Sequence, residues 1–171
     1  MSDDFEKIYD DDEDDDVMDS RFLEVCMDGD VEDLVQLFEE IARSGEILTA
    51  KDLNCIDASG RSAVSFLCAN GMIEMLEVLE DVLDIDYNMA DNEGNTPLHY
   101  AAQAGHVEVV SFLLTKVRTI QVDPINNYGF TPLMKAALQG RIKCSKLLLF
   151  SCKRRLSFIR LMTLSELCLL H

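Results

Sequence analysis

The amino-acid sequence predicts an all-α solenoid of about four helix–turn–helix repeats joined by hairpin loops. A block that begins with Thr96, Pro97 and Leu98 recurs at a spacing of 34–35 residues. Apolar residues within each unit follow the three- and four-residue spacing of amphipathic helices. Hydrophobic residues make up 48% of the 171 residues and aromatic residues only 7%, so we expect an aliphatic core.

The repeats emerge when residues 91–106 are superposed on the flanking sequence. The matches 35 positions later are Gly129, Thr131, Pro132, Leu133, Ala136, Ala137 and Gly140. Those 34 positions earlier are Asp57, Gly60, Ser62, Phe66, Leu67, Cys68 and Gly71. Those 76 positions earlier are Ser20, Phe22, Val25, Cys26 and Gly29. We therefore predict repeats at about 20–52, 57–87, 91–122 and 126–150.

Each recurring residue has a physical role in a helix pair. Thr96 and Thr131 can cap the start of a first helix, with Ser20 and Ser62 in the equivalent positions. A proline at the first helical position loses no hydrogen bond, because its backbone nitrogen would have no partner there. A glycine suits the left-handed conformation that ends the first helix. The Ala pairs allow neighbouring helices to approach closely.

The block Thr96–His99, followed by Ala101–Ala102 and Gly105–His106, resembles the ankyrin-repeat family. The resemblance covers roughly residues 20–150. It implies a module that binds other proteins through its hairpin tips and the exposed side of its first helices. Only the third repeat carries the whole block; the departures elsewhere are Ala63 for the proline, and Ser65 and Met134 for the histidine.

A finer resemblance concerns the third and fourth repeats. The runs 101–106, 129–131, 133–137 and 139–141 are similar to the photoreceptor ankyrin-repeat proteins, which are associated with nuclear repression of transcription through a homeodomain activator. The small cyclin-dependent kinase inhibitors of the ankyrin type are similar in size and share residues 91–95. The match in the fourth repeat favours the first of these two resemblances.

The family's binding surface can be carried onto this sequence residue by residue. The expected partner contacts are Arg61, Asn92, Glu93, Asn95, Gln103, Asn127, Tyr128, Phe130 and Leu138. Tyr128, Phe130 and Leu138 form an apolar set that is costly to expose without a use. The alternative is that these three side chains pack against a fifth repeat or against the C-terminal tail.

The formal charge of −17 is distributed unevenly along the chain. Residues 1–19 carry a net charge of −10 and few apolar side chains, so we expect a disordered acidic tail. This tail either keeps the protein soluble or attracts a basic partner. An acidic body repels phosphate backbones, so we expect no direct binding of nucleic acid.

The C-terminal residues 151–171 carry a net charge of +3 and contain a mostly apolar run, Leu156–Leu170, interrupted by Arg160 and Glu166. Three interpretations stay open: an improvised cap on the solenoid, the divergent end of a truncated or alternatively spliced product, and a helix on a membrane surface. Ser157 follows two arginines and is a candidate site for a basophilic kinase.

Nothing in the sequence predicts catalysis. His99 and His106 occupy positions with structural roles in the repeat, and neither has a cysteine or carboxylate at the spacing of a triad or zinc site. The six cysteines form no regular framework, and no secretory signal or span of ~18 uncharged apolar residues is found. We therefore expect a monomeric cytoplasmic or nuclear adaptor or regulator, without cofactor or metal, that acts by stoichiometric binding of another protein.

Overall fold

The computed structural model describes residues 15–45, 49–80, 82 and 84–152. Its named helices are α1 (Asp15–Asp28), α2 (Val31–Ser44), α3 (Ala50–Leu53), α4 (Ala63–Asn70), α5 (Ile73–Leu79), α6 (Pro97–Ala104), α7 (Val107–Thr115) and α8 (Pro132–Leu138). Residues 142–152 are also helical. The only β pairing in the described part is one antiparallel bridge between Ile56 and Ser62, so the predicted all-α class is confirmed.

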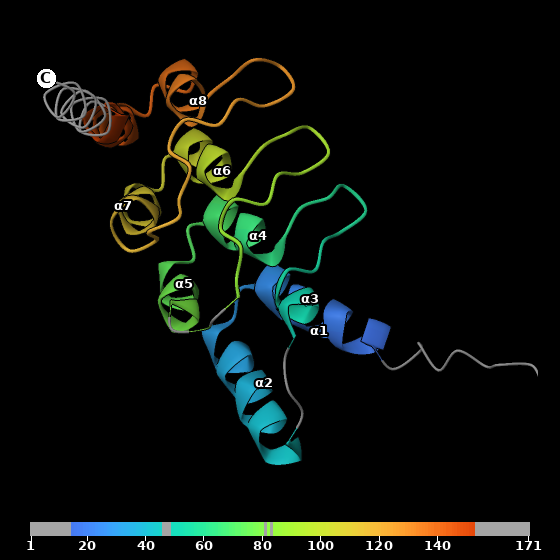
Figure 1. The fold of residues 1–171 in the computed structure, drawn as a ribbon. Coiled ribbons are helices and arrows are strands. Elements are labelled where there is room, and N and C mark those ends of the chain that lie inside the picture. Colours follow the sequence, from blue (N-terminus) through green and yellow to red (C-terminus); the bar gives the residue numbers. More distant parts are fainter. Residues whose placement is uncertain (1–14, 46–48, 81, 83, 153–171) are drawn as a thin grey trace, which may run out of the picture.

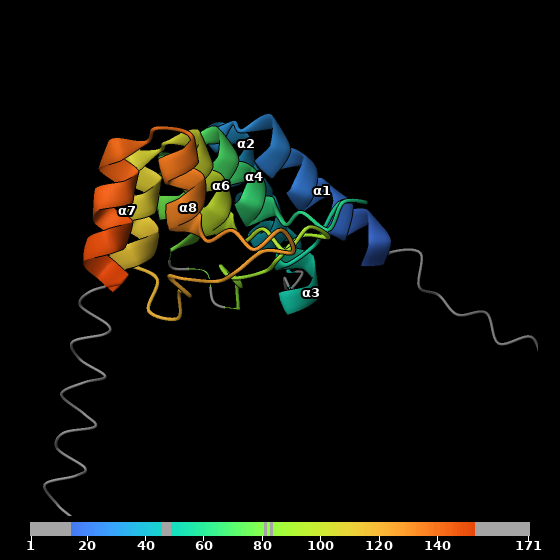
Figure 2. The ribbon, with the colours of Figure 1, turned by 90° about the horizontal axis from the view of Figure 1, so that it is seen from above.

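The helices form two rows that run the length of the molecule (Figure 1). The first helices of the repeats make one row, in which α1 packs on α4, α4 on α6 and α6 on α8. The second helices α2, α5 and α7 make the other row, which the helix over 142–152 continues (Figures 1 and 2). The hairpin loops project together from the row of first helices, so one side of the molecule is built from loop tips.

The start of the first repeat differs from the prediction. Helix α1 begins at Asp15, inside the segment 1–19 that was expected to be disordered. Ser20 lies within α1, so the prediction that it caps a helix start is wrong.

The expectations for the two ends lie outside the described residues. They concern the acidic residues 1–14, the tail from residue 153 onward, and the modification of Ser157.

The predicted helix signals act as expected in the later repeats. Ser62 accepts a hydrogen bond from the Ser65 amide at 3.3 Å, and Thr131 accepts one from the Met134 amide at the same distance. The first helices α4 and α6 end at glycines in the left-handed conformation, and α1 is followed by one. These local signals are why three short helices of seven or eight residues, α4, α6 and α8, begin at equivalent positions.

The core is aliphatic, as the composition predicts. Its fully buried side chains include Leu34, Leu37, Leu67, Leu76, Leu98, Leu113 and Leu148. Ala101, Ala102 and Ala136 are also completely buried, which lets α6 lie close to its neighbours. Cys68 and Cys144 are buried, and burial raises the pKa of both thiols, so they act as small core residues rather than nucleophiles.

Three long side chains connect the second, third and fourth repeats to one another. His106 donates from Nε2 to the Ala69 carbonyl at 3.0 Å, which ties the third repeat to the second. Arg141 donates from Nε to the Gln103 carbonyl at 3.2 Å, which ties the fourth repeat to the third. Because each acceptor lies near the end of a first helix, these bonds satisfy carbonyls that the helix itself leaves without a partner.

His99 connects the third repeat to the fourth. The hydrogen bonds at its two ring nitrogens require the uncharged form of the imidazole. Its Nδ1 accepts from the Thr96 amide at 3.1 Å and lies 3.0 Å from the Thr96 hydroxyl, as predicted for a structural histidine. Its Nε2 lies 3.0 Å from the Phe130 carbonyl and therefore carries the proton. A second proton would have to sit on Nδ1, against the Thr96 amide that donates to it.

This arrangement predicts a pH dependence of stability. Burial lowers the pKa of His99 below its ordinary value. Because the unfolded chain then takes up this proton at a higher pH than the folded chain, the free energy of unfolding should fall as the pH drops below about 6.5. Urea unfolding at pH 7.5 and pH 5.5 measures this fall, which should be smaller in His99→Gln. An equal fall in both proteins would show that His99 is not its source.

Candidate protein-binding surface

The hairpins before α4, α6 and α8 share one internal design. The amide of the first residue donates to the carbonyl four residues later at 3.0 Å; the pairs are Asp57 to Arg61, Asp91 to Asn95, and Asn126 to Phe130. The side-chain oxygen of the same first residue accepts from the amides two and four residues later. The recurring Asp or Asn therefore holds each loop closed, and this explains its place in the repeat.

The hairpins are also bonded to one another. The Asn92 amide donates to the Ser59 carbonyl at 3.0 Å, and the Asn127 amide donates to the Glu93 carbonyl at 2.9 Å. The Asn127 side chain adds a bond to the Asn92 carbonyl at 3.0 Å. The three loops therefore form one row connected by backbone hydrogen bonds. Asn92 and Asn127 make these bonds and are also exposed.

Asn95 lies inside this row and is not available to a partner. Only 4% of its surface is exposed, and its Oδ1 accepts from Asn126 Nδ2 at 2.8 Å. Its Nδ2 donates to Asp91, which also accepts from the Tyr100 hydroxyl. Burial alone would raise the pKa of Asp91, but the hydrogen bonds from Tyr100, Asn95 and Glu93 lower it below its ordinary value. The placement of Asn95 on the partner surface is corrected accordingly.

Arg61 also has a structural position. Its guanidinium carbon lies 4.0 Å from the centre of the Phe66 ring and 4.6 Å from the centre of the Tyr100 ring. It is therefore held between an aromatic ring of its own repeat and one of the next, in cation–π geometry. The stacking connects the second and third repeats, and it leaves Arg61 only partly accessible.

The fourth repeat exposes the apolar set that the sequence singled out. Tyr128 is 63% exposed, Leu138 is 67% exposed and Phe130 is 37% exposed. Tyr128 donates from its hydroxyl to Glu93 at 3.4 Å, and the Lys135 ammonium lies 6.0 Å from the centre of the Phe130 ring. An aromatic surface with an acid on one side and a cation on the other therefore lies at the last hairpin.

Sequence reasoning missed two further residues of this surface. Met134 is 49% exposed and lies one helical turn before Leu138, so both side chains share a face of α8. Lys135 stands at the position of Tyr100 and adds the charge beside Phe130. The spacing of four residues between Met134 and Leu138 was the available signal. Glu93 and Gln103 are exposed, as expected.

Two negative findings concern the described residues alone. These residues contain no group of three or more His, Cys, Asp and Glu side chains arranged to hold a metal ion. Within them, no helix combines the length and apolar character needed to cross a bilayer.

Comparison with known proteins places this geometry in a family. A family model described as ankyrin repeats, three copies, matches residues 23–123 and again 81–156. The chain belongs to the ankyrin-repeat family. Ankyrin repeats are protein-binding modules, so the hairpin row and the first helices are the surface to consider for a partner.

The curated relatives are longer proteins that share part of this chain. Human ankyrin repeat domain-containing protein 63 is 34% identical over 94 residues, which are 54% of this chain and 24% of the relative. Human SMC5-SMC6 complex localization factor protein 1 is 37% identical over 91 residues, or 53% of this chain and 8% of the relative. Zebrafish (Danio rerio) inversin is 38% identical over 77 residues, or 44% and 7%. The chain thus spans less than a quarter of each relative's length, and the photoreceptor resemblance is not supported by these matches.

Two glycines of the ankyrin hairpins provide a matched test of the bonded row. Gly94 and Gly129 have similar positive φ angles of +79° and +81°. A Cβ on Gly94 would lie 2.8 Å from the Asn127 Oδ1 and 2.9 Å from the Asn127 nitrogen, whereas a Cβ on Gly129 meets nothing within 4 Å. Alanine should therefore strain the backbone at both sites but displace a neighbouring hairpin only at Gly94.

We expect Gly129→Ala to lower the free energy of unfolding by about 1–2 kcal/mol, the cost of the left-handed conformation. Gly94→Ala should cost about 1–3 kcal/mol more, because overpacking is added to the same strain. Urea denaturation of the two variants measures the difference. Equal losses would mean that the hairpins are not packed against each other as described.

Proposed function

We propose that this chain is an adaptor or regulator that acts by stoichiometric binding of another protein to the ankyrin hairpin row. The observation that carries the proposal is the exposure of Tyr128 and Phe130 on a hairpin whose backbone is bonded to its neighbour. Aromatic side chains contribute disproportionately to protein interfaces. A surface that is already ordered loses little conformational entropy on binding.

The chemistry of the surface suggests the character of the partner. Glu93 beside Tyr128 and Lys135 beside Phe130 provide one charge of each sign around the aromatic centre. We expect the partner to present an apolar or aromatic group that packs on Tyr128 and Phe130. Polar groups at its edge would pair with Glu93 and Lys135. Leu138 and Met134 extend the apolar surface along α8.

Two classes of partner follow from the finer resemblances. A transcription factor bound in the nucleus would make the chain a corepressor, and nuclear accumulation of a tagged protein would favour this class. A cyclin-dependent kinase would make it a kinase inhibitor, and inhibition of purified kinases by the purified chain would favour that class.

The double variant Tyr128→Ala with Phe130→Ala tests the proposed surface. It should lose at least about tenfold in affinity for the physiological partner, because two aromatic contacts are removed while the backbone bonds of the hairpin remain. A suitable control is Met27→Ala with Val35→Ala, which removes two exposed apolar side chains from the first repeat. Proteins recovered from cell extract with the natural chain and the control, but lost with the double variant, are candidates for measurement with purified components.

Circular dichroism of the double variant separates binding from packing. Unchanged helicity with lost affinity supports the proposal. Retained affinity would refute the proposed surface. Lost helicity would show instead that Tyr128 and Phe130 support the fold.

A further inference from the structure

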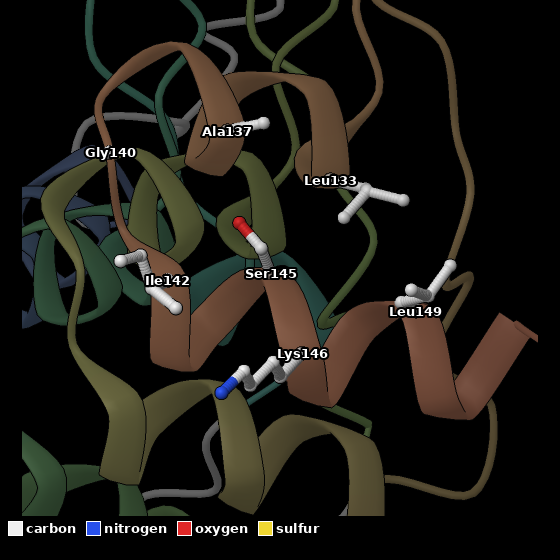
Figure 3. Close-up of a pocket in the computed structure, with 7 residues that line it drawn as sticks. All are labelled: Leu133, Ala137, Gly140, Ile142, Ser145, Lys146 and Leu149. Atoms are coloured by element: carbon white, nitrogen blue, oxygen red, sulfur yellow. The ribbon is translucent and has the colours of Figure 1, made fainter.

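The last repeat ends in an open apolar groove between α8 and the helix over 142–152 (Figure 3). Leu133 and Ala137 line it from α8, while Ile142 and Leu149 line it from the following helix. Its volume is about 320 Å³, and Lys146 is the only charged residue in its lining. A solenoid that ends in such a surface needs a cover with a polar outer side.

The equivalent surface of the third repeat shows that this groove is a repeat junction. The counterparts of Leu133, Ala137 and Ser145, 35 residues earlier, are Leu98, Ala102 and Val110. Each of these three is completely buried. The glycines that follow the two first helices show the same difference in packing. A Cβ on Gly105 would contact Arg141 of the fourth repeat, whereas a Cβ on Gly140 would meet nothing within 4 Å.

We propose that residues 156–170 of the same chain form a terminal helix that covers this groove. The helix over 142–152 forms one wall of the groove, and the chain continues directly from its end. The 19 residues 153–171 allow a three-residue turn over 153–155 and a helix of 15 residues over 156–170, about 22 Å long. This length exceeds the roughly 16 Å of the helix over 142–152.

The sequence of the segment has the pattern that such a cover needs. In helical geometry, Phe158, Leu161, Met162 and Leu169 lie on one side, at spacings of three, four and seven residues. Arg160 lies on the opposite side and would face water. The segment is itself too apolar to remain exposed without cost. One contact would therefore bury two apolar surfaces that otherwise face water.

The positions of the charged residues predict how the terminal helix aligns along the groove. Glu166 is the only acidic residue after Asp123, and it borders the apolar side of the segment next to Met162. A turn over 153–155 and an antiparallel return would bring residues 162–166 beside Lys146, within reach of its side chain. The only acid of the segment would then pair with the only charge of the groove lining.

The covalent connection favours this segment over other occupants. A tethered segment acts at an effective concentration of about millimolar, whereas a second copy must reach that concentration in solution. The tether also places the apolar residues next to the groove as soon as the fourth repeat folds. The hairpin proposed to bind a partner lies elsewhere on the fourth repeat, so this inference does not depend on the proposed function.

Two substitutions on opposite sides of the segment test the proposal in the full chain. Leu161→Asp places a charge on the side predicted to face the groove, and Leu167→Asp places the same charge on the other side. Hydrogen exchange of amides in α8 and in residues 142–152 should become about tenfold faster, or more, only with Leu161→Asp. Equal exchange in the two variants would overturn the proposal.

Charge exchange tests the register. Lys146→Glu and Glu166→Lys should each speed exchange in α8, and the two together should restore the slower rate, because the pair is re-formed with its signs reversed. Failure of the combined variant to restore protection would overturn the assigned pairing. Light scattering at two protein concentrations provides the remaining check, since protection that rises together with dimer formation would identify a second copy as the occupant.

Discussion

The structure depends on the contact between one repeat and the next. A single pair of short helices cannot bury its apolar face, so each repeat is completed by its neighbour. In this chain the contact has an apolar part, where α4, α6 and α8 pack in a row, and a polar part made by His99, His106 and Arg141. The polar bonds reach specific carbonyls of the adjacent repeat and therefore set the register of the stack.

The same constraint explains why the fourth repeat is the most informative part of the molecule. Its inner side is completed by the third repeat, which orders the hairpin that presents Tyr128 and Phe130. Its outer side carries junction residues such as Leu133 and Leu149 that line an open groove. The side of the repeat thus presents exposed aromatic residues on an ordered hairpin, whereas its end carries an open apolar groove.

Residues whose role is local could be predicted from the sequence. Helix ends are specified by residues close to them in sequence, such as Thr131, Pro132 and the glycines. The repeats could therefore be recognised from these residues alone. Roles that depend on a neighbouring repeat could not be predicted this way. The resemblance predicts Asn95 as an exposed partner contact, yet it bonds Asn126 of the next repeat and is buried. Arg61 likewise stacks on Tyr100, which lies 39 positions later.

The central claim, that hairpins of adjacent repeats are bonded into one ordered row, is tested most directly by amide hydrogen exchange at Asn92 and Asn127. Both amides lie in exposed loops, yet they donate to the carbonyls of Ser59 and Glu93. The account predicts that they exchange as slowly as amides within α6, because exchange requires the repeats to separate. Exchange at the rate of an unstructured peptide would contradict it and would leave Tyr128 and Phe130 on a loop without a fixed position.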